Sequence, residues 1–210
     1  MTQNILYIHG AYGSSTIFSR MVDDLPGHHA VLADYDCLTG SVDDIVSNLK
    51  CITSDSFDGE PYSVIAHSLG GIVALGLLAS GEPLERIFTM STPFGGNRSA
   101  GVLFIAFWHT PVLADVSLFG NTVRGLLKSE INIPVRSVVS TGGSSPQVSE
   151  ANDGVITVAS QTSLAGPDYH RVPCTHFGVL LADPVIDLAS DFLFQNSSTS
   201  GASSPLELVI

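Results

Sequence analysis

The chain has 210 residues, of which 44% are hydrophobic, and its 20 acidic and 8 basic side chains give a formal net charge of −12. This length and apolar content predict one domain with a sizeable core, and the negative charge disfavours nucleic acid and anionic membranes as partners. The three cysteines lack CxxC spacing, which argues against a disulfide framework or a zinc site.

Short apolar runs and amphipathic stretches alternate from the start of the chain. Asn4–His9 is typical of a buried parallel strand, and no basic or long apolar leader precedes it, so no signal peptide and a cytoplasmic location are expected. Ser15–Leu25 then has apolar residues at helical spacing, and His29–Tyr35 is a second expected strand. Ser41 is the expected N-cap of the next helix. The pattern is that of repeated strand and helix units.

The rest of the chain continues this alternation. Tyr62–His67 is a third expected strand, and the helix Leu69–Ser80 is apolar on all sides, with Gly81 as its expected C-cap. Further strands are expected at Arg86–Ser91, Val135–Thr141 and Tyr169–Pro173, and a last helix at Asp183. The order predicts an α/β fold: a mostly parallel sheet of about six strands with helices on both faces.

The stretch AHSLGG places a serine, Ser68, between a strand and a helix. Small residues at Ala66 and Gly70 would let the backbone turn sharply and expose the hydroxyl at the carboxyl end of the strand. The amide of Leu69 would then lie at a helix N-terminus, where it can stabilise a developing oxyanion. An ordinary helix-capping serine is the alternative, but the apolar strand and helix around it favour a nucleophile.

A nucleophilic serine needs a base and an acid. His176 follows the last expected strand in CTHFG, in a loop where a base would lie, whereas the rival His170 is inside that strand. Asp153 stands in the turn sequence NDG and is the expected acid, with Asp168 and Asp183 as rivals. The order serine, acid, base along the chain is the one expected for a nucleophile on a fold of this kind.

Five stretches carry a resemblance to a known family: YIHGAYGSS, AHSLGG, STPFGG, NDGVITVASQ and THFGVL. They resemble small α/β-hydrolases of the lipase/esterase type, and the similarity covers most of residues 4–194. The resemblance implies that the amides of Ala11 and Leu69 form an oxyanion hole. The chain differs from many members in having Ala66 where they have glycine, and in lacking the first antiparallel strands.

The expected function is hydrolysis of carboxylic esters through an acyl-enzyme, with a small-molecule or lipid acyl ester as substrate and without metal or organic cofactor. A thioesterase or amidase with the same residues is one alternative. A non-catalytic protein of this fold that binds an apolar ligand or a partner is another. The oligomeric state stays open.

A long apolar insertion, Phe94–Glu130, follows the strand after the elbow, and its most apolar part is too short to span a bilayer. We expect it to cap the active site and hold the acyl chain, although one more buried helix would explain the same composition. The expected substrate contacts are Tyr12, Phe94, Phe104 and Trp108. The domain is expected at 1–194, and the Ser-rich residues 195–210 are expected to form a flexible tail.

Overall fold

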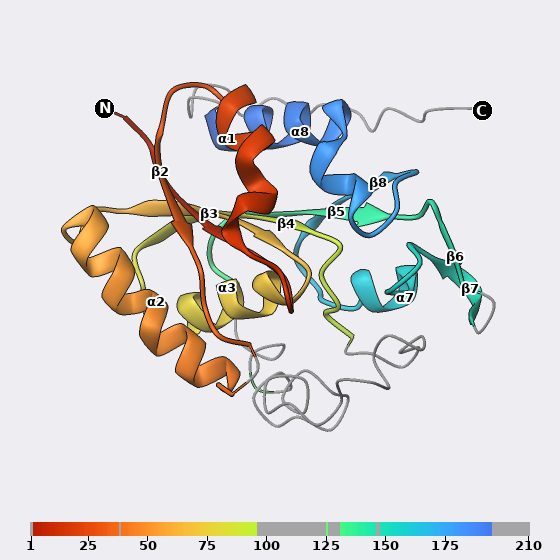
Figure 1. The fold of residues 1–210 in the computed structure, drawn as a ribbon, viewed down its shortest axis with the longest axis horizontal. Coiled ribbons are helices and arrows are strands. Elements are labelled where there is room, and N and C mark those ends of the chain that lie inside the picture. Colours follow the sequence, from red (N-terminus) through yellow and green to blue (C-terminus); the bar gives the residue numbers. More distant parts are fainter. Residues whose placement is uncertain (1, 38, 96–124, 126–130, 146–147, 195–210) are drawn as a thin grey trace.

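The computed structural model describes residues 2–37, 39–95, 125, 131–145 and 148–194. Its centre is a six-stranded parallel sheet in the order β2-β1-β3-β4-β5-β8 (Figure 1). The strands are β1 (Asn4–Ile8), β2 (His29–Ala33), β3 (Tyr62–His67), β4 (Leu84–Met90), β5 (Val135–Ser140) and β8 (Asp168–Val172). All six predicted strands are therefore confirmed, with bounds that differ by at most two residues.

Helices cover both faces of the sheet, as predicted. One face carries η1 (Ser15–Phe18), α1 (Ser19–Asp24), η2 (Gly178–Leu181) and α8 (Asp183–Phe194), and the other carries α2 (Val42–Phe57) and α3 (Leu69–Ala79) (Figure 1). Alternate residues of β1 point to opposite faces, so Ile5 and Tyr7 join one hydrophobic cluster while Leu6 and Ile8 join the other. This burial on both sides explains why β1 and β3 are mostly apolar.

Local signals in the sequence account for the helix ends. Ser41 caps α2 through a capping box with Asp44, each side chain bonding the other residue's backbone amide. Gly81 has φ 82° and follows the C-cap of α3, a conformation that glycine adopts without strain. The predicted helix Ser15–Leu25 is instead a 3₁₀ turn followed by an α-helix, as is common at helix N-termini.

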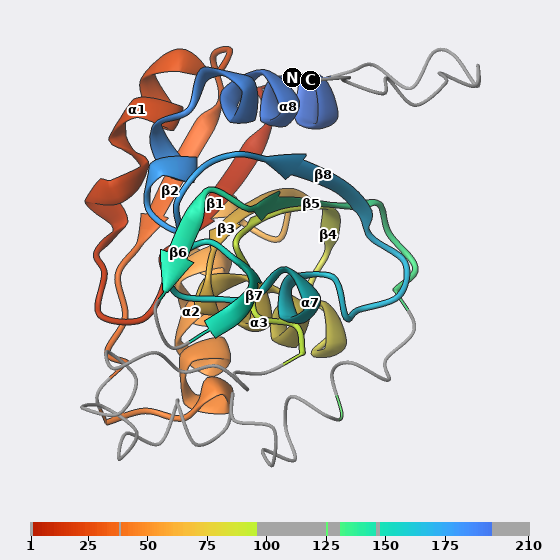
Figure 2. The same cartoon turned by 90° about the vertical axis from the view of Figure 1, so that its right-hand side faces the viewer.

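A small hairpin between β5 and β8 was not predicted. It consists of β6 (Gly143–Ser145) and β7 (Val148–Asn152) and is followed by the short helix α7 (Val158–Gln161). Figure 2 shows all three elements at the carboxyl ends of the strands. Strands as short as these, with the sequences GSS and VSEAN, have no apolar alternation to reveal them. The hairpin matters for function because Asp153 is the next residue after it.

In the portion of the chain that the structure describes, no helix is long and apolar enough to cross a membrane. Most of the expected cap, including Phe104 and Trp108, and the expected tail at 195–210 lie outside the described residues. The domain bounds and the cap thus stay predictions.

Candidate active site

Ser68 occupies a sharp turn between β3 and α3. Its backbone has φ 53° and ψ −120°, a left-handed conformation that is unusual for a residue other than glycine, and its side chain is half-buried. Two residues on, a Cβ placed on Gly70 would lie only 2.3 Å from the carbonyl oxygen of Ile8. Glycine at this position therefore lets the start of α3 lie directly against the end of β1.

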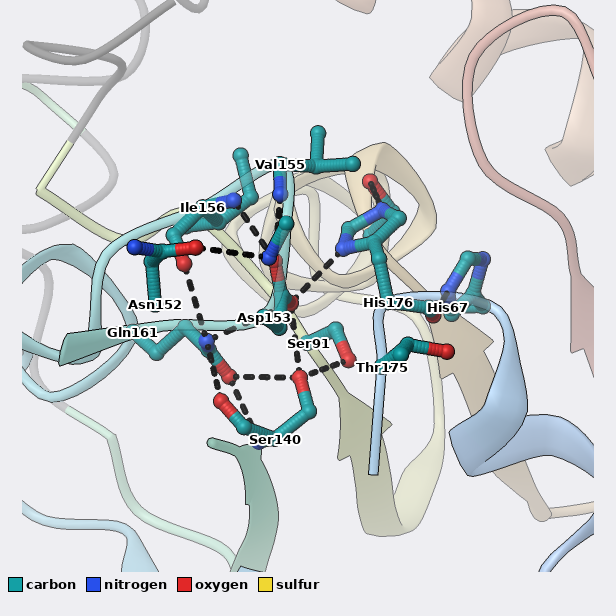
Figure 3. Close-up of polar contacts among 12 residues, drawn as sticks. His67, Ser91, Ser140, Asn152, Asp153, Val155, Ile156, Gln161, Thr175 and His176 are labelled. Atoms are coloured by element: carbon teal, nitrogen blue, oxygen red, sulfur yellow. Dashed lines mark hydrogen bonds and ion pairs between the residues drawn. The ribbon is translucent and has the colours of Figure 1, made fainter. Parts of the chain in front are cut away.

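Three side chains form a hydrogen-bonded chain that starts at this turn. The hydroxyl of Ser68 lies 3.1 Å from Nε2 of His176, within donating distance, and Nδ1 of His176 lies 2.8 Å from Oδ2 of Asp153. Figure 3 shows His176 turned toward Asp153. Both residues are nearly inaccessible to solvent, at 4% and 1% exposure. The structure thus brings together the three residues that the sequence singled out, although 85 residues separate Ser68 from Asp153.

The loops that carry acid and base are also joined through their backbones. The amide of His176 donates to the carbonyl oxygen of Asp153 at 2.9 Å, alongside the side-chain bond. On the elbow side, Nε2 of His67 donates to the carbonyl oxygen of His176 at 2.8 Å. The position of the imidazole is therefore fixed from two directions.

The rival candidates lie elsewhere. His170 bonds Asp168 at the edge strand β8, and Asp168 also forms an ion pair with Arg136. Asp183 is exposed and pairs with Arg20 on the opposite face from α3. None of these residues has a described contact with Ser68, so the geometry favours His176 and Asp153 over them.

The surroundings of Asp153 favour its ionised form. Burial alone would raise the pKa of this carboxyl group, but the hydrogen bond and charge of His176, with bonds from the Ile156 amide and the Ser140 hydroxyl, lower the pKa below its usual value. A carboxylate that stays ionised can hold the Nδ1 proton of His176 and leave Nε2 free to accept one.

The loop after β1 lies against Ser68. A Cβ on Gly10 would be 3.0 Å from Cβ of Ser68. The next residue, Ala11, has an amide that donates to no acceptor in the described parts of the chain. Leu69 is the first residue of α3, and its amide has no partner within that helix. The amides that the family resemblance assigned to an oxyanion hole thus have no partner in the described hydrogen bonds, and their role stays a prediction.

Sequence reasoning missed the residues that hold this loop. Nδ1 of His9 donates to the carbonyl oxygen of Gly10 at 2.7 Å, and the imidazole stacks on the ring of Tyr35 with centroids 4.1 Å apart. The Tyr35 hydroxyl donates to the carbonyl oxygen of His9, and the amide of Tyr12 donates to Sγ of Cys37 at 3.3 Å. These contacts join the loop to the chain segment after β2, which no local pattern in the sequence indicates.

The expected substrate contacts have mixed positions. Tyr12 is 42% exposed with φ 57° beside the turn. Phe94 is fully buried and belongs to the hydrophobic cluster on the α3 side of the sheet. Their roles in substrate binding stay predictions.

Within the described residues, no three His, Cys, Asp or Glu side chains come together as a metal site would need.

His67 should make folding stability depend on pH. Burial, followed by the nearby His176, lowers the pKa of this imidazole to about 3, whereas the unfolded chain has the usual value near 6.5. Between these two pH values the unfolded state binds a proton at His67 and the folded state does not. The free energy of unfolding is therefore unaffected by His67 above about pH 6.5 and falls as the pH drops toward about 3.

We therefore expect His67 to lower the free energy of unfolding by up to ~1.4 kcal/mol for each unit by which the pH falls across this window. Urea unfolding at intervals of pH would measure the slope. The variant His67→Gln, which keeps a donor for the carbonyl group but does not titrate, should have a shallower slope. Equal slopes in both proteins would contradict the expectation.

A family model described as the alpha/beta hydrolase family matches residues 5–206 of the chain. The chain belongs to the alpha/beta hydrolase family. No curated protein sequence matches this hydrolase. The family assignment agrees with the parallel sheet and with the turn at Ser68, where members of this fold place their nucleophile.

Solved structures with the same fold include lipases and other hydrolases. A lipase of Bacillus licheniformis in its mature form has 17% identity and a TM-score of 0.73, with 91% of this hydrolase and 92% of the lipase covered. A phospholipase of Legionella pneumophila has 14% identity and a TM-score of 0.76, with 92% of this hydrolase but 59% of the phospholipase covered. An alpha/beta superfamily hydrolase of Oenococcus oeni has 12% identity and a TM-score of 0.68, with 92% of each chain covered. At these identities the likeness shows the fold alone.

Proposed function

We propose that this hydrolase cleaves carboxylic esters with Ser68 as nucleophile, His176 as base and Asp153 as the acid that orients the base. The observation that carries the proposal is the chain of two hydrogen bonds from Ser68 to His176 and from His176 to Asp153, at 3.1 and 2.8 Å. Serine is a weak nucleophile at neutral pH, so a neighbouring imidazole within hydrogen-bond reach is what its activation needs.

The reaction follows from this arrangement. As Oγ of Ser68 attacks the ester carbonyl carbon, its proton moves to Nε2 of His176, and Asp153 stabilises the imidazolium that forms. The amides of Ala11 and Leu69 would hold the tetrahedral oxyanion, and each such donor contributes on the order of 10²- to 10³-fold in rate. His176 then gives its proton to the departing alcohol, and water attacks the acyl-enzyme by the same route.

The substrate is proposed to be a small-molecule or lipid acyl ester. A lipase and a phospholipase are among the proteins of the same fold, which makes lipid esters worth testing beside simple ones. The expectations of a cytoplasmic location and of no nucleic-acid partner stay predictions. So do the substrate contacts of Tyr12 and Phe94 and the cap that includes Phe104 and Trp108.

Two assays test the proposal. Nitrophenyl esters of graded acyl length should be hydrolysed with saturation kinetics, and a fluorophosphonate should add one label per chain, which mass spectrometry should place on Ser68. Thioester and anilide analogues of the best substrate would distinguish an esterase from a thioesterase or amidase. A protein that binds acyl chains without reacting with the fluorophosphonate would instead be the non-catalytic alternative.

A further inference from the structure

A closed polar cluster lies behind Asp153. It consists of Ser91, Ser140 and Gln161, which come from the end of β4, the end of β5 and α7 (Figure 3). Both serines are fully buried, and Gln161 is 1% exposed. Buried polar groups are costly unless they are hydrogen-bonded, so the contacts within this cluster need an explanation.

The donors and acceptors in the cluster can be assigned. The side-chain amide of Gln161 accepts from the backbone amide of Ser140 and donates to its carbonyl oxygen, both at 3.0 Å. The hydroxyl of Ser140 has one proton, and it lies 2.6 Å from Oδ2 of Asp153 but 3.3 Å from Oε1 of Gln161. The shorter bond to an ionised acceptor is the stronger one, so Ser140 donates to Asp153.

This assignment fixes the role of Ser91. Its Oγ lies 2.6 Å from Oγ of Ser140. Because the only proton of the Ser140 hydroxyl is used on Asp153, Ser91 must donate in this pair. The hydrogen bonds therefore run in one direction, from Ser91 to Ser140 to Oδ2 of Asp153, and they end on the same oxygen that His176 binds.

The other carboxylate oxygen is held separately. Oδ1 of Asp153 accepts from the backbone amides of Val155 at 2.9 Å and Ile156 at 2.7 Å. Oδ2 has a third donor besides His176 and Ser140, since Nε2 of Gln161 lies 3.4 Å from it. Five donors thus surround the carboxylate, two on Oδ1 and three on Oδ2. Those on Oδ1 belong to its own turn, whereas Ser140 belongs to β5, which is paired with a strand on each side, and ties the acid to the sheet.

We propose that Ser140, supported by Ser91, is a positioning residue that holds Oδ2 of Asp153 in line with Nδ1 of His176. The inference rests on the proposed function, since it assigns a role to a neighbour of the proposed acid. Without the Ser140 hydroxyl, Oδ2 loses a donor, Ser91 loses its acceptor, and the carboxylate can turn away from the imidazole. Removing a residue that only positions the acid should lower the turnover rate more than it weakens substrate binding.

The test compares Ser140→Ala with Ser137→Ala. Ser137 is a matched control because it lies in the same strand and is fully buried, and in the described structure its hydroxyl has no hydrogen-bond partner. Kinetics with a nitrophenyl ester are measured per active site, by titration with a fluorophosphonate, so that unfolded protein does not count. We expect Ser140→Ala to lower kcat by ~10- to 100-fold, the size of a lost hydrogen bond to a charged group, with KM within about threefold.

The pH profile gives a second readout that a merely structural role would not change. The Ser140 hydroxyl is one of the groups that lower the pKa of Asp153. Without it the carboxylate holds a proton more readily, so the acid limb of the kcat profile should move to higher pH in Ser140→Ala. It should stay in place in Ser137→Ala.

The outcomes separate the two proposals. If the parent protein neither hydrolyses esters nor reacts with the fluorophosphonate, the proposed function fails and the positioning role fails with it. If the parent is active but Ser140→Ala and Ser137→Ala have equal kcat and the same acid limb, only the positioning role is overturned. Should Ser140→Ala give no folded protein, Ser91→Ala decides: a smaller shift of the acid limb in the same direction supports the proposal, and an unmoved limb overturns it.

Discussion

Ser68→Ala is expected to reduce kcat/KM for a nitrophenyl ester by about a thousandfold or more while leaving the protein folded. The loss follows from the removal of the only atom in the hydrogen-bonded chain that can attack the carbonyl carbon. The fold should survive because Ser68 is half-buried and its described side-chain contact is the one with His176. Thermal unfolding followed by circular dichroism would check this.

Ser80→Ala is the matched control, since Ser80 caps the opposite end of the same helix. It should retain the parent activity. Combining Ser68→Ala with His176→Ala should add little further loss, because the members of such a triad act as a unit. Residual activity of Ser68→Ala within about tenfold of the parent would contradict the assignment of the nucleophile.

Asp153→Asn should reduce kcat by about 10³- to 10⁴-fold, even though the replacement is nearly the same size. Five donors point at this side chain, and an amide has only one oxygen with which to accept from them. If the NH₂ group faces His176, the imidazole must move its proton to Nε2 and cannot accept one from Ser68. If the NH₂ group faces the turn, it meets the amides of Val155 and Ile156.

The control is Asp168→Asn, which changes a carboxylate that is paired with Arg136 and His170 on the sheet edge. Its turnover should stay close to that of the parent. Steady-state kinetics of both variants at one pH suffice for the comparison. A larger loss in Asp168→Asn than in Asp153→Asn would mean that the acid is wrongly assigned.

The sheet and its helices could be predicted from the sequence because the signals are local. The buried strand β3 is a mostly apolar run, and Ser41 marks the start of α2 as an N-cap residue. The position of Ser68 was also predictable, since small residues between an apolar strand and an apolar helix fit few other turns. The strand order itself came only with the structure.

The residues that hold the site's side chains and loops in place could not be predicted, for a physical reason. Ser140 lies in the strand sequence VRSVVS, where nothing distinguishes it from other strand serines. Its role depends on the contact with Asp153, which is 13 residues away in the sequence and which the strand pattern does not indicate. Gln161 binds the backbone of Ser140 from a helix that the sequence did not indicate. Likewise, His9 acts on the loop after β1 by stacking on Tyr35. Contacts between residues that are distant in the sequence leave no periodic pattern or fixed spacing in it.

The paired bonds between Asp153 and His176 limit how the scaffold can be remodelled. Backbone joins backbone at 2.9 Å and side chain joins side chain at 2.8 Å, so neither loop can shift without the other. An engineer who exchanges one of them for the loop of another enzyme would displace both residues. A graft between scaffolds of this kind should therefore transfer the continuous block from Asp153 to His176, with α7 and the edge strand β8 included.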